Sequence, residues 1–147
     1  MRIQELLATK NLAPIVLIRL MVGAVFLSEG IQKFLFPADV GIGRFTKIGI
    51  PYPEIMAPFV AVIEIGCGSL ILVGLLTRLA AIPLIINMLV AIATTKIPIL
   101  ANKGFWSMAH EARTDWSMLL GAIFLLIVGA GPISMDAKIN RRRGGEE

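Results

Sequence analysis

The sequence predicts an all-α integral membrane protein, a four-helix bundle with a Gly- and Pro-rich loop between its first and second helices. Of its 147 residues, 56% are hydrophobic, and the mean hydropathy is +0.82. Such values are typical of membrane proteins rather than soluble domains. The apolar residues gather into four segments, and about 20 mostly apolar residues in a helix cross the hydrocarbon of a bilayer. We therefore expect a multi-pass protein embedded in lipid.

The four expected membrane helices follow one another along the chain. The first, Leu12–Phe34, is too long for a signal-peptide core and lacks a clean cleavage site after it, so it is expected to be an uncleaved span. The second and third cover about Ile55–Leu76 and Leu79–Ile99, and the short turn at Arg78 predicts that they form an antiparallel hairpin. The fourth covers about Trp116–Ala130 and ends at a Gly- and Pro-rich stretch.

Two longer segments connect these helices on one side of the membrane. Residues 37–54 are rich in Gly and Pro and predict an ordered or re-entrant loop. Residues 101–115 are polar and aromatic, and two interpretations remain open: a solvated lead into the fourth helix, or a lid in which Phe105 and Trp106 cover a cavity. Pro98 either kinks the third helix or marks its end.

The charge distribution predicts the orientation. An even number of spans places both termini on one side, and Lys and Arg are divided almost equally between the two sides. The charged N-terminus and the run Arg141–Arg143 lie close to membrane ends, so the positive-inside rule predicts that both termini are cytoplasmic, in the inner (plasma) membrane. We expect a four-span membrane domain over residues 1–137 and a basic cytoplasmic tail over 138–147. No nucleic-acid partner is expected, because basic residues are not interleaved with aromatic ones.

Charged residues inside the apolar segments are the main candidates for a functional site. Arg19, Glu29, Lys33 and Glu64 each cost roughly 2.5–3.5 kcal/mol at a helix centre. Glu64 falls near the expected midplane, where Arg19 is its best-placed partner by depth. One interpretation is an Arg19–Glu64 clamp that only fixes two helices. The other is that Arg19, Glu29 and Glu64 line a polar cavity. Glu29 and Lys33 are four residues apart, the favourable order for a helical ion pair.

Further ligand-binding candidates are more weakly indicated. Asn87 lies in the third segment, where it either holds neighbouring helices or touches a ligand. His110, Glu111 and Asp115 lie in the polar segment before the fourth helix, and Glu111 and Asp115 are one helical turn apart. The H-E-x-x-H pattern is absent, so no metal site is predicted.

No cofactor fingerprint and no catalytic residue can be assigned. The single Cys67 excludes a dithiol cycle within one chain and is expected to be a packing residue. The glycines of residues 41–44 form no dinucleotide loop, because no strand precedes them, so there is no flavin or NAD signature.

Taken together, these stretches resemble the DoxX family of small four-span membrane proteins. The resemblance rests on Arg19 with GAVFLSEGIQKF, the loop GRFTKIGIPYPE, Glu64 in EIGCGSLILVGLLTR, and the later FWSMAHEARTD and GAGPISMD, which contains Ser134 and Asp136. Family members are linked to thiosulfate:quinone oxidoreductase, to membrane complexes with thiol-stress and superoxide-handling enzymes, and to quinone detoxification. The resemblance implies a quinone- or thiol-linked role.

Three functions remain open from the sequence. The first is a membrane subunit that binds a quinone or related redox molecule, with Arg19, Glu29 and Glu64 as hydrogen-bond and proton partners, and with electrons supplied by a soluble oxidoreductase. The second is a non-catalytic anchor for such an oxidoreductase. The third is a small oligomeric transporter. A homo-oligomer is expected, and whether the chain is itself an enzyme stays open.

Overall fold

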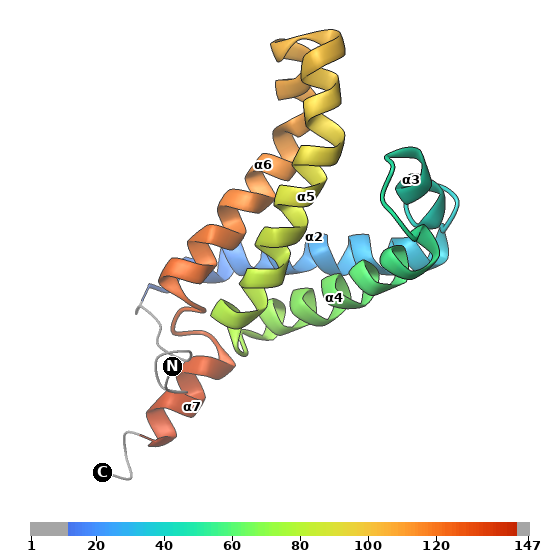
Figure 1. Ribbon diagram of the computed structural model, residues 1–147. Helices are drawn as coiled ribbons and strands as arrows, with labels where there is room; N and C mark the ends of the chain where they lie inside the picture. Colours follow the sequence, from blue (N-terminus) through green and yellow to red (C-terminus); the bar gives the residue numbers. More distant parts are fainter. Residues whose placement is uncertain (1–11, 144–147) are drawn as a thin grey trace.

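A computed structural model describes residues 12–143, and this part of the chain is helical without any strand. Three of its helices are long and apolar enough to cross a membrane, namely α2, α4 and α5. The predicted all-α membrane bundle is thereby confirmed. Arg2 and Lys10, which contributed to the predicted orientation, lie outside the described residues. The helices in chain order (Figure 1) are α2 (Ile15–Leu35), α3 (Ile42–Lys47), α4 (Pro53–Val73), α5 (Thr77–Lys103), α6 (Phe105–Val128) and α7 (Met135–Arg143).

Residues 101–115 do not form a separate connection, and the interpretation as a solvated lead into the fourth helix fits the structure. α5 continues through Pro98 to Lys103, and α6 begins at Phe105, so only Gly104 interrupts the two helices. Gly104 has φ +82°, a backbone conformation that favours glycine. Polar residues in the first half of α6 remain helical because they lie on the exposed surface of a hairpin. They also explain why α6 is not among the helices that are long and apolar enough to cross a membrane.

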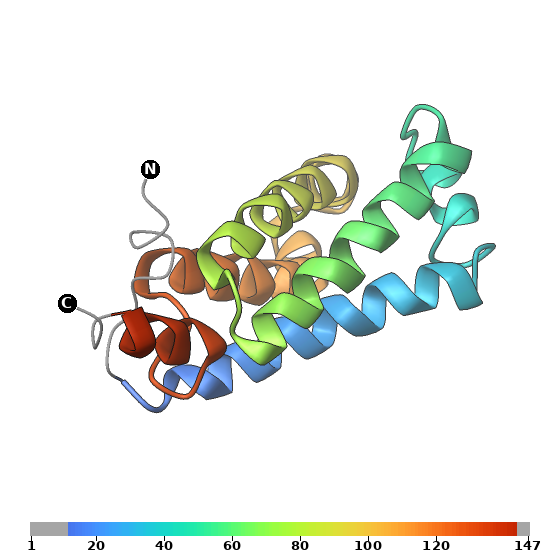
Figure 2. The ribbon, with the colours of Figure 1, turned by 90° about the horizontal axis from the view of Figure 1, so that it is seen from below.

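Close packing of α2 against α4 depends on small residues. A Cβ atom built on Gly68 would lie 2.8 Å from the backbone N of Leu27, and one built on Gly23 would lie 2.9 Å from the carbonyl O of Gly68. The two helices lie side by side in both ribbon views (Figures 1 and 2). Without side chains at these positions, the two backbones approach closely, as in other membrane helix pairs.

The helices form two pairs that diverge from a common base. α4 and α5 are joined by a tight turn at Gly74–Leu76, but α5 then packs mainly along α6 rather than α4. The predicted hairpin of the second and third segments is therefore present, and Asn87 on α5 still donates a hydrogen bond to Glu64 on α4 at 2.8 Å, but α6 is the main neighbour of α5. In Figure 1 the α5–α6 pair, here called the arm, rises away from α2 and α4, and α3 lies at the far end of the α2–α4 pair. Both ends of the described chain lie at the base.

α7 is anchored to the base through Asp136. Its carboxylate accepts hydrogen bonds from the backbone N–H of Leu76 at 2.7 Å and of Thr77 at 3.2 Å, which caps the N-terminus of α5. Burial raises the pKa of the Asp136 carboxyl above its ordinary value, and the two backbone donors act in the opposite direction. The expected boundary between residues 137 and 138 falls inside α7.

Candidate functional site

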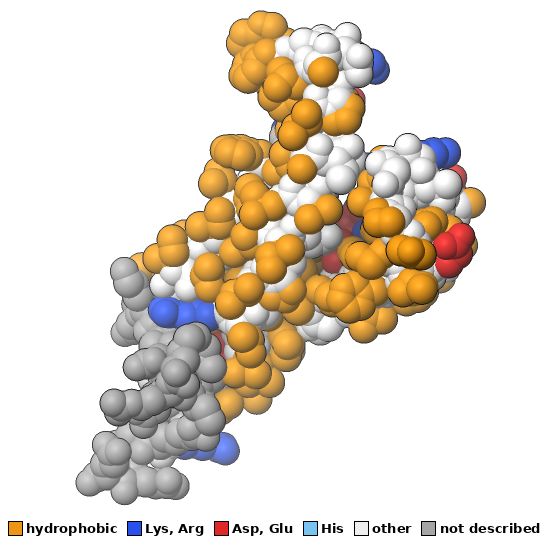
Figure 3. Space-filling view, viewed as in Figure 1, with side chains coloured by type: hydrophobic (Ala, Val, Ile, Leu, Met, Phe, Trp, Pro, Cys, Tyr) orange, Lys and Arg blue, Asp and Glu red, His pale blue; other side chains and the backbone are white. Residues whose placement is uncertain are grey.

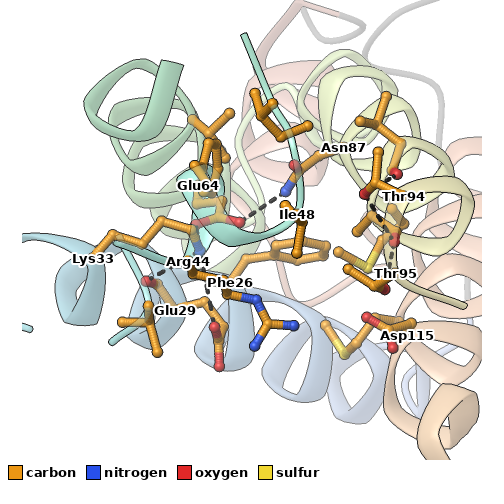
Figure 4. A pocket seen from close by; sticks show the side chains of 18 of the residues that line it. Phe26, Glu29, Lys33, Arg44, Ile48, Glu64, Asn87, Thr94, Thr95 and Asp115 are labelled. Carbon is orange, nitrogen blue, oxygen red and sulfur yellow. Dashed lines mark hydrogen bonds and ion pairs between the residues drawn. The ribbon is translucent and has the colours of Figure 1, made fainter. Parts of the chain in front are cut away.

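A cavity of about 330 Å³ lies where the two helix pairs diverge. All four long helices and the α3 region contribute to its wall. Its size is at the lower end of the roughly 300–1,000 Å³ typical of small-molecule sites. The cavity can therefore hold a molecule of about one ring. Six charged side chains line it (several labelled in Figure 4): Glu29, Lys33, Arg44, Glu64, Lys96 and Asp115.

Glu64 is the centre of one polar end of the cavity. Its side chain is only 4% exposed, and its Oε2 lies 2.7 Å from Lys33 Nζ. Asn87 Nδ2 donates to the other oxygen, Oε1, at 2.8 Å. Lys33 Nζ also lies 3.9 Å from Glu29 Oε2, so the predicted Glu29–Lys33 pair is confirmed. Each Glu64 oxygen thus has a partner, which compensates for the loss of hydration in apolar surroundings.

A second polar end is formed by the arm. Lys96 Nζ lies 3.0 Å from Asp115 Oδ2, and the Lys96 side chain is 8% exposed. Thr94 and Thr95 lie beside this pair on α5, and their hydroxyls donate to backbone carbonyls one turn earlier at 2.8 Å and 2.6 Å. The oxygens of both hydroxyls therefore keep a lone pair for a ligand.

Apolar side chains separate the two polar ends. Figure 4 shows Phe26 and Ile48 between Glu64 on one side and Asp115 on the other. Met88 and Met118 also line the cavity. Because thioether side chains adapt to irregular shapes, this part of the wall can accommodate a flat apolar ligand.

Arg44 brings a further cation to the rim. It lies on α3 and is exposed, and within residues 12–143 its side chain forms no hydrogen bond or ion pair. Sequence reasoning did not select Arg44, because a short helix in a Gly- and Pro-rich segment gives no periodic signal. It also missed Lys96 and Thr95. The signal for Lys96 was its place within four residues of the end of the third apolar segment, where it was counted only as an orientation charge.

The structure brings five of the eight sequence-selected residues to this cavity: Glu29, Lys33, Glu64, Asn87 and Asp115. His110 and Glu111 lie on the exposed surface of α6 and do not line it. Although Glu111 and Asp115 are one turn apart, only Asp115 reaches the wall. Among the described residues, no three His, Cys, Asp or Glu side chains are grouped closely enough to hold a metal ion.

Arg19 lies at the base, and the expected Arg19–Glu64 pair is wrong. The Arg19 guanidinium donates to the carbonyls of Ile71 at 2.9 Å, Leu72 at 2.6 Å and Ala130 at 3.2 Å, and also to the carbonyl of Ile133. The carbonyls in the last turn of a helix lack partners within the helix, and a guanidinium has five donors to offer them. Depth alone placed Arg19 near Glu64, whereas its side chain extends the other way, toward the C-terminus of α4.

Comparison with known proteins also indicates a membrane protein. The chain is 52% identical over 144 residues, 94% of its own length and 88% of the relative, to the "Uncharacterized membrane protein Rv3486" of Mycobacterium tuberculosis. It is 30% identical over 122 residues, 82% of each chain, to the "Putative oxidoreductase CatD" of Bacillus subtilis. No solved structure matches. The model of the DoxX family matches residues 15–97. The chain therefore belongs to the DoxX family of membrane proteins.

Proposed function

We propose that this protein is a membrane component of a quinone- or thiol-linked oxidoreductase system and binds a small redox molecule in the cavity between its helices. The observation that carries the proposal is the buried Glu64 carboxylate, held by Lys33 and Asn87 at the wall of a ring-sized cavity. An ionisable group at membrane depth is costly, and in membrane proteins it commonly marks a functional site. The name of the Bacillus subtilis relative supports an oxidoreductase system.

The residues at this end suit a redox ligand that exchanges protons. A quinone supplies an acceptor for two electrons and two protons. Lys33 and Asn87 are positioned to donate hydrogen bonds to a carbonyl oxygen in the cavity. A proton can be held at Lys33 Nζ or at Glu64 Oε2, which are 2.7 Å apart. Such positioned groups assist proton transfer.

The proposal includes a redox partner. With one Cys and one His in the sequence, the chain cannot by itself run a dithiol cycle or supply two His ligands to a haem. We therefore assign electron delivery to a soluble oxidoreductase that docks on the protein. We also propose a plasma-membrane location with cytoplasmic termini, supported by the basic residues of α7 at the base. A homo-oligomer is proposed because little of α5 is buried within one chain, 11% of its apolar window.

The test is native mass spectrometry of the gently solubilised protein, with extraction and optical spectra of any bound small molecule. We expect a co-purifying quinone or related redox molecule that is lost in Glu64→Gln. The matched control is Glu111→Gln, which removes an exposed carboxylate outside the cavity. Protein that retains no such molecule and binds none when quinone is added back contradicts the proposal and favours a non-catalytic anchor.

A further inference from the structure

We infer that Lys96, Asp115 and Thr95 recognise the second end of the ligand. The ligand is then a neutral, lipid-soluble molecule with a hydrogen-bonding group at each end of a ring-sized apolar body, rather than an anion. This inference rests on the proposed function and defines the chemical class of its ligand.

The charges of the cavity balance one another. Its wall carries the cations Lys33, Arg44 and Lys96 and the same number of carboxylates. Lys33 lies between Glu64 and Glu29, and Lys96 is paired with Asp115. A buried anion needs a cation that is not already compensated.

Arg44 does not meet this need. It is the one lining cation without an ion pair among the described residues, but it lies exposed at the rim, where water and salt screen its charge. A neutral ligand leaves both internal ion pairs in place. The balance of charges therefore favours a neutral molecule over thiosulfate or another anion.

Both ends retain hydrogen-bonding capacity. A lysine ammonium has three donors, and Lys96 directs one toward Asp115 at 3.0 Å. Asp115 keeps a second oxygen, and the Thr95 hydroxyl, which donates to the carbonyl of Ala91 at 2.6 Å, can still accept. Across the apolar middle of the cavity, Lys33 and Asn87 provide donors at the other end (Figure 4). A ligand with two opposite polar groups satisfies both ends at once.

The surroundings of the cavity match a ligand dissolved in the bilayer. In the space-filling view (Figure 3), acidic and basic side chains are visible at the bottom of a notch between the arm and the α3 region, and apolar side chains surround it. A neutral molecule can enter through such a notch from lipid without the desolvation penalty that a charged one carries.

The experiment compares three probes on the full-length protein in detergent under anaerobic conditions, with dissociation constants from native mass spectrometry. The probes are tetramethylhydroquinone, which has two opposite hydroxyls, tetramethylphenol, which has one, and thiosulfate. We expect the two-ended probe to bind about tenfold more tightly than the one-ended probe, the value of roughly one hydrogen bond, and thiosulfate not to compete.

The tenfold preference should disappear in the double variant Lys96→Met/Asp115→Leu. This variant removes both charges of the second end together, so neither is left buried without its partner. Thr95→Val removes only a hydroxyl and should reduce the preference. It tests the second end independently if the double variant does not fold. The control Lys103→Met/Glu111→Gln alters exposed residues of the same arm and should keep the preference.

Four results would overturn the inference. Competition by thiosulfate, or a preference unchanged in both the double variant and Thr95→Val, rejects the two-ended neutral ligand. Equal binding of both neutral probes, lost in Glu64→Gln, rejects the second end but leaves the proposed function standing. Absence of binding by any probe rejects both.

Discussion

The guanidinium of Arg19 illustrates how one charged side chain is stabilised among apolar helices. It is only 3% exposed, and its donors reach carbonyls of the last turns of α4 and of the segment that follows α6. Asp136 adds a favourable charge nearby. Arg19 thus ties together three parts of the base that are distant in sequence, which is a structural role.

We expect Arg19→Met to lower the free energy of unfolding by at least about 3 kcal/mol. Each hydrogen bond to a charged group contributes roughly 1.5–3 kcal/mol, Arg19 makes several, and the cost of burying the guanidinium offsets only part of their sum. The measurement is equilibrium unfolding in mixed detergent. Arg113→Met is the control, since Arg113 is exposed and, within residues 12–143, donates only to the carbonyl of His110, one turn earlier. Equal stability of Arg19→Met and the control would show that the Arg19 hydrogen bonds do not support the base.

At the scale of single residues, the sequence identified several of the residues that line the site but did not predict how they pair. Glu64 and the Glu29–Lys33 pair stood out because charges are rare in apolar runs. Their partners depend on the rotation of each helix about its axis. Depth along the helix does not determine this rotation. Depth therefore suggested Arg19 as the partner of Glu64, whereas the partner in the structure is Lys33. Lys96 escaped notice because its partner, Asp115, lies in the polar segment that was expected to connect the third and fourth helices.

Among the elements, α2 and α4 make a contact that is sensitive to side-chain size. A Cβ at Gly68 would meet the backbone of Leu27 at 2.8 Å, and backbone cannot move aside as a flexible side chain can. Gly66 lies two residues away on the same helix, and no neighbouring atom of the described chain lies within 4 Å of a Cβ built there. Gly66 is therefore a suitable control position for a substitution at Gly68.

We expect Gly68→Ala to destabilise the protein by about 1–3 kcal/mol, the usual cost of overpacking. Gly66→Ala should be neutral or stabilise by up to about 1 kcal/mol, since alanine favours helix over glycine. Thermal unfolding of both variants in the same detergent measures the difference. Stability of Gly68→Ala equal to that of Gly66→Ala would contradict the close approach of the two backbones.

The elements also differ in how far the sequence predicts them. α2, α4 and α5 follow from long apolar runs, and their observed bounds differ from the expected ones by a few residues. The first half of α6 and the helix α7 do not follow from apolar runs, because both segments are polar. Hydropathy detects burial in lipid rather than helical backbone. α3 is too short for a periodic pattern. The divergence of the two helix pairs depends on packing between distant segments, which local sequence does not encode.

Both ends of the described chain lie at the base, and the tips of both helix pairs point away from it (Figure 1). α2 leads away from the base, α4 returns to it, and α5 and α6 repeat this path. Three exposed positions report on this arrangement: Thr46 on α3, Asn102 near the tip of the arm and Arg142 on α7.

We expect single cysteines at positions 46 and 102 to react with a membrane-impermeant maleimide in intact cells, and a cysteine at 142 to react only after the cells are opened. This follows from the common end shared by α3 and the arm tip and from the proposed cytoplasmic base. The experiment uses a Cys67→Ala background, and that background without an added cysteine is the control. Labelling of positions 46 and 142 from the same face would contradict the arrangement of the helices across the membrane.

The equal numbers of cations and carboxylates around the cavity have a consequence for energised cells. Moving one elementary charge through a membrane potential of about 100 mV changes its free energy by about 2.3 kcal/mol, or nearly fiftyfold in an equilibrium constant. A neutral ligand that settles among the balanced pairs of this cavity carries no net charge through that field. Its occupancy is then independent of voltage, so the protein is loaded equally well in respiring and in de-energised cells.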